Sequence, residues 1–138
     1  MELTSQEIRS ISAFSKRELG AWGEEKAAAY LISLGVRILA RNWRCRYGEI
    51  DIVAFQPDLG AILAVEVKTR RSVQAGIPEE AITSEKLQRM RMLIVAWLHL
   101  HGEICRDLHW RELRVQVIAI DLQGARAGEY ELRYLREL

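Results

Sequence analysis

The segments Gly48-Glu49-Ile50-Asp51 and Glu66-Val67-Lys68 decide the expected fold of this chain. Each segment is typical of a β-strand, in which alternate side chains point to the same face. Glu49 and Asp51 are therefore expected on one face of their strand, and Glu66 and Lys68 on one face of theirs. If the two strands are neighbours, three carboxylates and one amine meet on a single patch of the sheet.

The residues between the two segments predict that the strands form an antiparallel pair. Residues 56–60 include Pro57 and Gly60, which are typical of a turn. Directly opposed residues of an antiparallel pair point to the same face, so the register decides whether the acidic side chains meet. The register expected here places Asp51 opposite Glu66, Glu49 opposite Lys68 and Val53 opposite Ala64.

A cluster of carboxylates of this kind predicts a metal site. Buried charges are costly unless they are paired, and a hard divalent cation is a natural partner for several carboxylate oxygens. Asp51 and Glu66 with Lys68 beside them therefore indicate a metal-dependent phosphodiesterase. The alternative is a structural network of ion pairs, in which Lys68 neutralises the neighbouring acids on an exposed sheet.

Length and composition are typical of one globular domain, which we expect to span residues 16–138 after an N-terminal segment, residues 1–15, of possible flexibility. The chain has 138 residues, of which 49% are hydrophobic and 28% charged. Its longest apolar run, residues 92–98, is far shorter than the ~20 residues that span a bilayer. We therefore expect a cytoplasmic protein with no membrane association.

The net charge of +1 does not by itself indicate a nucleic-acid-binding protein. The distribution of the charges is more informative, because residues 37–46 contain four arginines and no acid. Basic residues that flank the predicted carboxylates are candidates for contacts to a phosphate backbone. These candidates are Arg44, Arg46, Arg70 and Lys86.

The apolar pattern predicts an αβββαβ order with a further C-terminal strand, giving a central mixed sheet flanked by helices. A helix is expected from Arg17 to a C-terminal cap at Gly35, and a second helix is expected to begin at Thr83 or Ser84. Gly20 and Gly23 in the first helix suggest a close approach to another segment. The expected strands are residues 36–43, 49–55, 61–69, 113–120 and 129–135, the third being central.

Several segments together resemble a known family. They are Gly20-x-x-Gly23-Glu24, Ala27-x-x-Tyr30-Leu31, Ile38-Leu39-Ala40-Arg41-Asn42, Gly48-Glu49-Ile50-Asp51, Val65-Glu66-Val67-Lys68-Thr69-Arg70 and Lys86. In these residues the chain resembles the YraN-like family of uncharacterised bacterial proteins. That family belongs to the restriction-endonuclease-like superfamily and is related to archaeal Holliday-junction resolvases.

The resemblance implies a restriction-endonuclease-like fold and an endonuclease that uses Mg²⁺ or Mn²⁺. It assigns catalysis to Asp51, Glu66 and Lys68, and gives Glu24 the role of an additional metal ligand carried by a helix. Glu49 is then expected to orient Lys68 or to lie on the surface. In the strand after the second helix the family usually has an Asp where this chain has Gln116.

The expected substrate is nucleic acid, and more specifically structured or branched DNA. Kinship to resolvases also suggests a homodimer whose two-fold axis matches that of a junction. The alternative is a catalytically inactive module on the same fold that binds nucleic acid or a protein partner.

Overall fold

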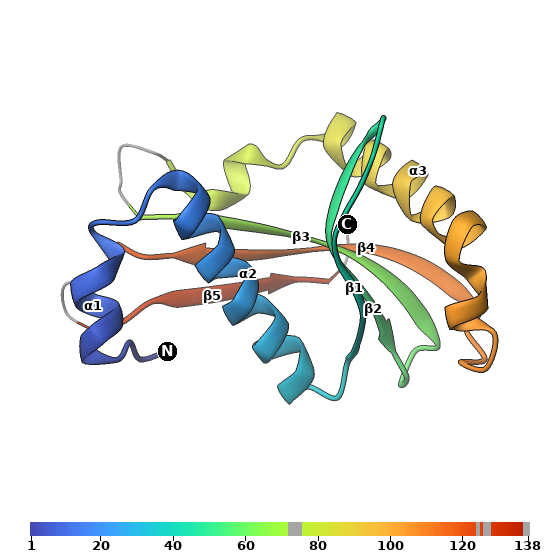
Figure 1. The fold of residues 1–138 in the computed structure, drawn as a ribbon, viewed down its shortest axis with the longest axis horizontal. Coiled ribbons are helices and arrows are strands. Elements are labelled where there is room, and N and C mark those ends of the chain that lie inside the picture. Colours follow the sequence, from blue (N-terminus) through green and yellow to red (C-terminus); the bar gives the residue numbers. More distant parts are fainter. Residues whose placement is uncertain (72–75, 124, 126–127, 137–138) are drawn as a thin grey trace.

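A computed structural model describes residues 1–71, 76–123, 125 and 128–136 (Figure 1). Five strands form one sheet in the order β1-β2-β3-β4-β5, in which only β3 and β4 are parallel neighbours. The strands are β1 (Arg37–Cys45), β2 (Gly48–Gln56), β3 (Ala61–Arg70), β4 (Glu112–Asp121) and β5 (Glu131–Leu135). The helices are α1 (Ser5–Ile11), α2 (Lys16–Ser33) and α3 (Ser84–His101), with short 3₁₀ turns η2 (Pro78–Ala81) and η3 (Gly102–Cys105). The predicted mixed sheet flanked by helices is confirmed.

Strand β3 is the central strand of the sheet, as its apolar start predicts. Residues 61–67 are all buried, and β3 has β2 on one side and β4 on the other. A strand that is covered on both faces needs apolar side chains at successive positions rather than at alternate ones. The polar end of β3, which carries Lys68, therefore emerges from the core at one end of the sheet.

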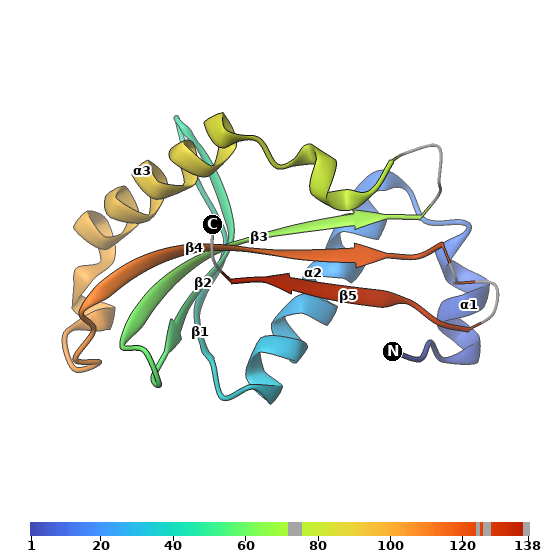
Figure 2. The ribbon, with the colours of Figure 1, turned by 180° about the vertical axis from the view of Figure 1, so that it is seen from behind.

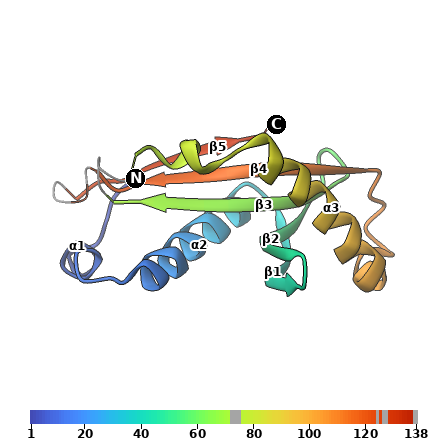
Figure 3. The ribbon, with the colours of Figure 1, turned by 90° about the horizontal axis from the view of Figure 1, so that it is seen from above.

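Helices α2 and α3 cover opposite faces of the sheet. Ile52 and Leu63 share an apolar cluster with residues of α2, whereas Val53 and Ile62 share another with residues of α3. Helix α2 lies in front of the strands in Figure 1 and behind them in Figure 2, while α3 lies towards the other end of the sheet (Figure 3). The alternation of side chains along β2 and β3 thus supplies both halves of the core.

The register between β2 and β3 is the predicted one. Val53 lies opposite Ala64, and the ladder runs from Gln56–Ala61 to Ile52–Val65. It stops there, although β2 continues to pair with β1 as far as Gly48. Strands β2 and β3 therefore separate just before the two positions that carry the acidic residues.

The helix ends follow their capping residues. Gly35 after α2 has φ +83°, which glycine adopts at little cost, and Thr83 accepts a hydrogen bond from the backbone N–H of Lys86 at the start of α3.

The two glycines of α2 differ in the space around them. A Cβ on Gly23 would lie 1.9 Å from Oγ1 of Thr69 in β3, whereas one on Gly20 would have no atom within 4 Å. The expected close approach is therefore confirmed at Gly23 and wrong at Gly20.

Residues 1–15, which the sequence assigns no role, pack against the rest of the chain. Leu3 and Ile11, which flank and end α1, are buried. Glu7 of α1 accepts a 2.7 Å hydrogen bond from the indole N–H of Trp22 and pairs with Lys26 at 2.9 Å. Within the part of the chain that the structure describes, no helix is long and apolar enough to cross a membrane.

Candidate functional site

The predicted catalytic residues line one pocket of about 770 Å³, which we call the acidic pocket. Its walls are the first half of α2, the β1–β2 hairpin, the end of β3 and the first half of α3. The side chains of Asp51, Glu66 and Lys68 all contribute to the lining, together with Glu24 and Glu49. Four carboxylates from α2, β2 and β3 therefore line one cavity.

The separation of β2 from β3 creates the position of Asp51. In the predicted register the next residue pair would be Asp51 with Glu66, but the ladder ends one pair earlier. Instead, Oδ2 of Asp51 accepts a 2.8 Å hydrogen bond from the backbone N–H of Val67. Asp51 thus satisfies a backbone donor that the ladder leaves unpaired, and this bond uses one of its two carboxylate oxygens.

Two carboxylates of the acidic pocket, Asp51 and Glu24, have raised pKa values, with burial as the main cause. The pKa of Asp51 is raised to about 7, by burial and then by the nearby Glu66, against the lowering effect of the Val67 hydrogen bond. Glu24 and Glu49 act in the same direction on Asp51. Burial likewise raises the pKa of Glu24. Raised pKa values of this kind are typical of a site that is completed by a cation or of a functional acid.

Glu66 is the centre of a group of cations. Its side chain is 8% exposed, and its Oε1 lies 2.6 Å from Nζ of Lys86 and 3.3 Å from Nζ of Lys68. Burial lowers the pKa of Lys68, and the neighbouring Lys86 lowers it further, whereas Glu66 opposes the shift. Lys68 is therefore more easily deprotonated than a lysine on the surface.

Glu49 occupies the second of its two predicted places, the surface, whereas Lys86 lies in a place that was not predicted. Glu49 pairs with Arg44 at 3.0 Å rather than with Lys68, and its side chain is half-exposed at the rim of the acidic pocket. Lys86, expected to contact a phosphate backbone, instead contacts the predicted metal ligand Glu66. The side chain that orients Lys68 is accordingly Glu66.

The remaining basic candidates divide into two groups. Arg44 lines the acidic pocket, whereas Arg46 lies against the ring of Tyr47 at the tip of the hairpin and Arg70 is outside the pocket lining. Sequence reasoning missed three other cations of the lining, which are Lys16, Arg17 and Arg89. Helical spacing could have found two of them, since Arg17 precedes Glu24 by two turns and Arg89 follows Lys86 by one.

Asn42 is a further residue of the acidic pocket that the sequence analysis did not assign to the site. It has φ +52°, a left-handed conformation that asparagine tolerates better than most residues. Its flanking residues Arg41 and Trp43 pair with Ile52 and Ile50, so Asn42 lies across from Asp51. Residues with such sparsely populated backbone conformations cluster at functional sites.

Gln116, which replaces the usual Asp of the resembling family, lies outside the acidic pocket. Its side chain is fully buried, and its Oε1 accepts a hydrogen bond from the hydroxyl of Tyr134. Among the described residues its Nε2 has no hydrogen-bond partner. Gln116 therefore serves the packing of β4 against β5.

The carboxylates of the acidic pocket fit a hard divalent cation by chemistry, but they do not converge in this arrangement. Among the described residues, no group of three or more His, Cys, Asp or Glu side chains lies close enough to hold one ion. The contacts explain this result, because Glu66 is held by two lysines, Glu49 by Arg44 and Asp51 by Val67. If Glu66 were released from its two lysines, its carboxylate would be available beside Asp51 as a second oxygen ligand for a metal ion.

Comparison with known proteins agrees with the motif-based resemblance. The family described as "Uncharacterised protein family UPF0102" matches residues 23–120, which include every carboxylate of the acidic pocket. A UPF0102 protein of Mycolicibacterium smegmatis is 44% identical over 119 residues, which cover 86% of this chain and 92% of that protein. UPF0102 proteins of Rhodococcus jostii and Rhodococcus opacus are 47% and 48% identical over 102 residues, which cover 74% of this chain and 80% of each relative.

Proposed function

We propose that this chain, which belongs to the UPF0102 family, is a metal-dependent endonuclease that hydrolyses phosphodiester bonds in structured or branched DNA. The family assignment confirms the YraN-like resemblance. The restriction-endonuclease-like superfamily, the reaction, the cofactor and a cytoplasmic location remain parts of the proposal. The observation that carries it is the meeting of Asp51, Glu66 and Lys68 in one cation-rimmed pocket.

Asp51, Glu66 and Glu24 are the residues that would hold Mg²⁺ or Mn²⁺. Their oxygen donors suit either ion, and burial together with the nearby Glu66 raises the pKa of Asp51, which a bound cation would lower again. When bound, such an ion supplies charge stabilisation for the phosphate and makes a bound water more acidic. Asp51 and Glu66 lie on neighbouring strands of the core, so their backbone positions are fixed by the sheet.

Lys68 is the residue that would act on the reacting groups. Its ammonium group lies 3.3 Å from Glu66, which holds it at the mouth of the separated strands. From there it can donate a hydrogen bond to the attacking water or to a phosphate oxygen. Its lowered pKa also allows it to accept a proton closer to neutral pH than a surface lysine does.

The rim of the acidic pocket would bind the phosphates on either side of the scissile bond. Lys16, Arg17, Arg44 and Arg89 contribute four cations from α2, β1 and α3. Contacts of this type to the backbone confer affinity without a preference for base sequence. A substrate recognised by its shape, such as a branched duplex, is compatible with a rim formed by three separate elements.

A cleavage panel tests this proposal. Linear, flapped and four-way DNA and a matched RNA are incubated with Mg²⁺, Mn²⁺ or a chelator, and the parent protein is compared with Asp51→Asn and Lys68→Ala. We expect metal-dependent cleavage of branched DNA that falls by roughly 10²-fold or more in each variant. Equal cleavage by all three proteins would show a contaminating nuclease and reject the proposal.

A second candidate function is a binding module without catalysis. The observation that favours it is the pair of lysines on Glu66, which already neutralises the predicted metal ligand. In that case branched DNA binds equally well with Mg²⁺ or with chelator, and Asp51→Asn leaves binding unchanged. The binding measurement therefore separates the two candidates even if no cleavage is observed.

A further inference from the structure

An exposed aromatic side chain lies beside the acidic pocket, at the turn of the β1–β2 hairpin. Cys45 pairs with Gly48, so Arg46 and Tyr47 form a two-residue turn. Turns of this length favour glycine, asparagine and aspartate. Tyr47 is 69% exposed, the largest fraction among the large hydrophobic residues that the structure describes. The needs of the turn therefore do not account for a tyrosine at this position.

The turn is held in place by α3. Gly48 has φ +149°, and a Cβ at this position would lie 3.2 Å from Cδ1 of Leu93 and 3.6 Å from Cδ of Arg89. A close approach of this kind favours glycine. Leu93 is buried, so the hairpin packs on α3 close to the core, and its turn reaches the edge of the molecule (Figure 1, Figure 3). Tyr47 is therefore presented beside the acidic pocket, whose lining includes Gly48.

Two cations without carboxylate partners lie close to this turn. The guanidinium group of Arg46 lies over one face of the Tyr47 ring, 4.9 Å from its centre. Neither Arg46 nor Arg89 forms an ion pair with a residue that the structure describes, whereas Arg44 pairs with Glu49 at 3.0 Å. Because Tyr47 remains largely exposed, the second face of its ring is open. An open ring face beside unpaired cations suits a nucleic-acid base with its neighbouring phosphates.

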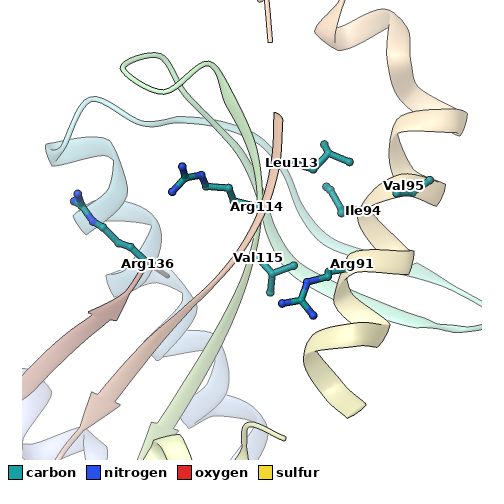
Figure 4. A pocket seen from close by; sticks show the side chains of 7 residues that line it. All are labelled: Arg91, Ile94, Val95, Leu113, Arg114, Val115 and Arg136. Carbon is teal, nitrogen blue, oxygen red and sulfur yellow. The ribbon is translucent and has the colours of Figure 1, made fainter. Parts of the chain in front are cut away.

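A second large cavity of the molecule lacks this combination. It has a volume of about 670 Å³ and lies between α3 and the first half of β4 (Figure 4). Its described lining consists of three arginines and four apolar side chains, without an aromatic ring or a carboxylate. One of these arginines, Arg114, pairs with Glu112 at 3.0 Å. Of the two cavities, the acidic pocket is the one that combines carboxylates with a neighbouring exposed ring.

We propose that Tyr47 stacks on an unpaired base at the branch point of a forked or flapped DNA, while the rim of the acidic pocket holds the adjoining phosphates. This inference rests on the proposed function, because it takes DNA as the ligand of the acidic pocket. An intact duplex keeps its bases stacked on one another and offers none to Tyr47, whereas a fork or flap leaves a base unpaired. The preference for branched over linear DNA then depends on one aromatic ring.

The hairpin also sets the distance between the stacked base and the proposed metal site. Gly48 precedes Asp51 by three residues along β2, and a strand rises ~3.3 Å per residue, so the turn lies roughly 10 Å from Asp51. One strand of duplex DNA advances ~3.4 Å per nucleotide. Cleavage is therefore expected about three nucleotides from the branch point.

Fluorescence of 2-aminopurine tests the stacking without cleavage. One probe is a flapped DNA with 2-aminopurine at the first unpaired position, the other is a linear duplex with it at the same sequence position, and both are measured with chelator. We expect the parent protein to quench the flapped probe. Tyr47→Leu should abolish the quenching and weaken binding of flapped DNA about tenfold, while changing binding of the duplex by less than about twofold. Tyr47→Phe keeps the ring and should behave like the parent.

Trp110→Leu is the matched control. Trp110 is a second exposed aromatic residue, 40% accessible, and it lies just before Glu112, which begins β4 opposite Ala61. Lys68 lies towards the other end of the same ladder, opposite Ala119. Trp110 is therefore at the end of β3 that is remote from the acidic pocket. Trp110→Leu should leave the quenching and the affinity for both probes unchanged.

The outcomes separate this inference from the proposed nuclease activity. Quenching of the flapped probe by the parent and its loss in Tyr47→Leu, without any cleavage in Mg²⁺ or Mn²⁺, would reject the nuclease and support the stacking. Parental affinity and quenching in Tyr47→Leu would overturn the stacking even if branched DNA is cleaved. The stacking is also overturned if Tyr47→Phe behaves like Tyr47→Leu, if both probes lose affinity equally, or if cleavage occurs more than about six nucleotides from the branch point.

Discussion

Nζ of Lys86 lies 2.6 Å from Oε1 of Glu66, so an α3 lysine holds the carboxylate that β3 contributes to the acidic pocket. Lys68 shares the same oxygen at 3.3 Å. A divalent cation and the Lys86 ammonium group therefore compete for one buried carboxylate. This relationship, rather than the presence of the carboxylates alone, is expected to control metal binding at the proposed site.

Removal of Lys86 is expected to increase metal affinity. In Lys86→Met the competing charge is lost, and we expect the Kd for Mn²⁺ measured by calorimetry to fall about tenfold, equivalent to ~1.4 kcal/mol. Arg89→Met is the matched control, because Arg89 lines the same pocket and carries the same charge. It should change the Kd by less than about twofold. Unchanged or weaker binding in Lys86→Met would contradict competition for Glu66.

Asp51 is expected to make the stability of the protein pH-dependent. Its pKa is raised from 3.8 to about 7, so the folded state retains a proton that the unfolded state loses. The contribution to stability is fully present below the unfolded pKa and is lost as the pH rises through 7. The rise of the pKa from 3.8 to about 7 corresponds to about 4 kcal/mol in the free energy of unfolding.

Urea unfolding of Asp51→Asn and the parent protein measures this effect. The variant has no carboxyl to ionise, and its amide oxygen can still accept the Val67 hydrogen bond. The free energy of unfolding of the variant relative to the parent should therefore increase between pH 4 and pH 8. A difference that stays constant over this range would show that the Asp51 pKa is not raised in the folded state.

Gly23 and Gly20 form a matched pair on α2. Gly23→Ala places a methyl group 1.9 Å from Oγ1 of Thr69, and we expect a loss of roughly 1–3 kcal/mol in the free energy of unfolding. Gly20→Ala meets no atom within 4 Å and should raise it by up to ~1 kcal/mol through helix propensity. Urea unfolding compares the two. The close contact is disproved if both substitutions have the same sign.

Substitution of Arg17 or Arg70 tests which basic residues around the acidic pocket contact nucleic acid. Arg17 lines the acidic pocket, although the sequence analysis missed it, whereas Arg70 was predicted and lies outside the lining. We expect Arg17→Gln to weaken binding of branched DNA and to reduce the slope of log K against log salt by about 0.9. Arg70→Gln should leave the slope nearly unchanged. The reverse result would move the nucleic-acid interface out of the acidic pocket.

The sequence predicted the local structure and the register because the physical signals are local. Alternating side chains around Asp51 and Glu66, the turn at residues 56–60 and the apolar start of β3 were sufficient to place Val53 opposite Ala64. The capping residues Thr83 and Gly35 also specified their helix ends. Each of these signals depends on residues that are neighbours in the chain.

Partner choice among charged side chains could not be predicted in the same way. The sequence left Glu49 either beside Lys68 or on the surface and predicted Lys86 on a phosphate, whereas the structure pairs Glu49 with Arg44 and Lys86 with Glu66. These pairs depend on where the ladder between β2 and β3 stops and on how α3 crosses the sheet. A difference of a few ångströms in either changes which charge is closest.

The amino-acid sequence by itself determined the family, through its motifs. It also determined the mixed sheet and the residue types of the acidic pocket, because apolar periodicity and turn chemistry act over short stretches of chain. Only the tertiary structure decided that Glu66 is held by two lysines, that Asp51 caps the Val67 N–H and that β2 and β3 stop pairing at Ile52 and Val65. These features arise where separate elements meet or stop pairing, and no local pattern records where that occurs.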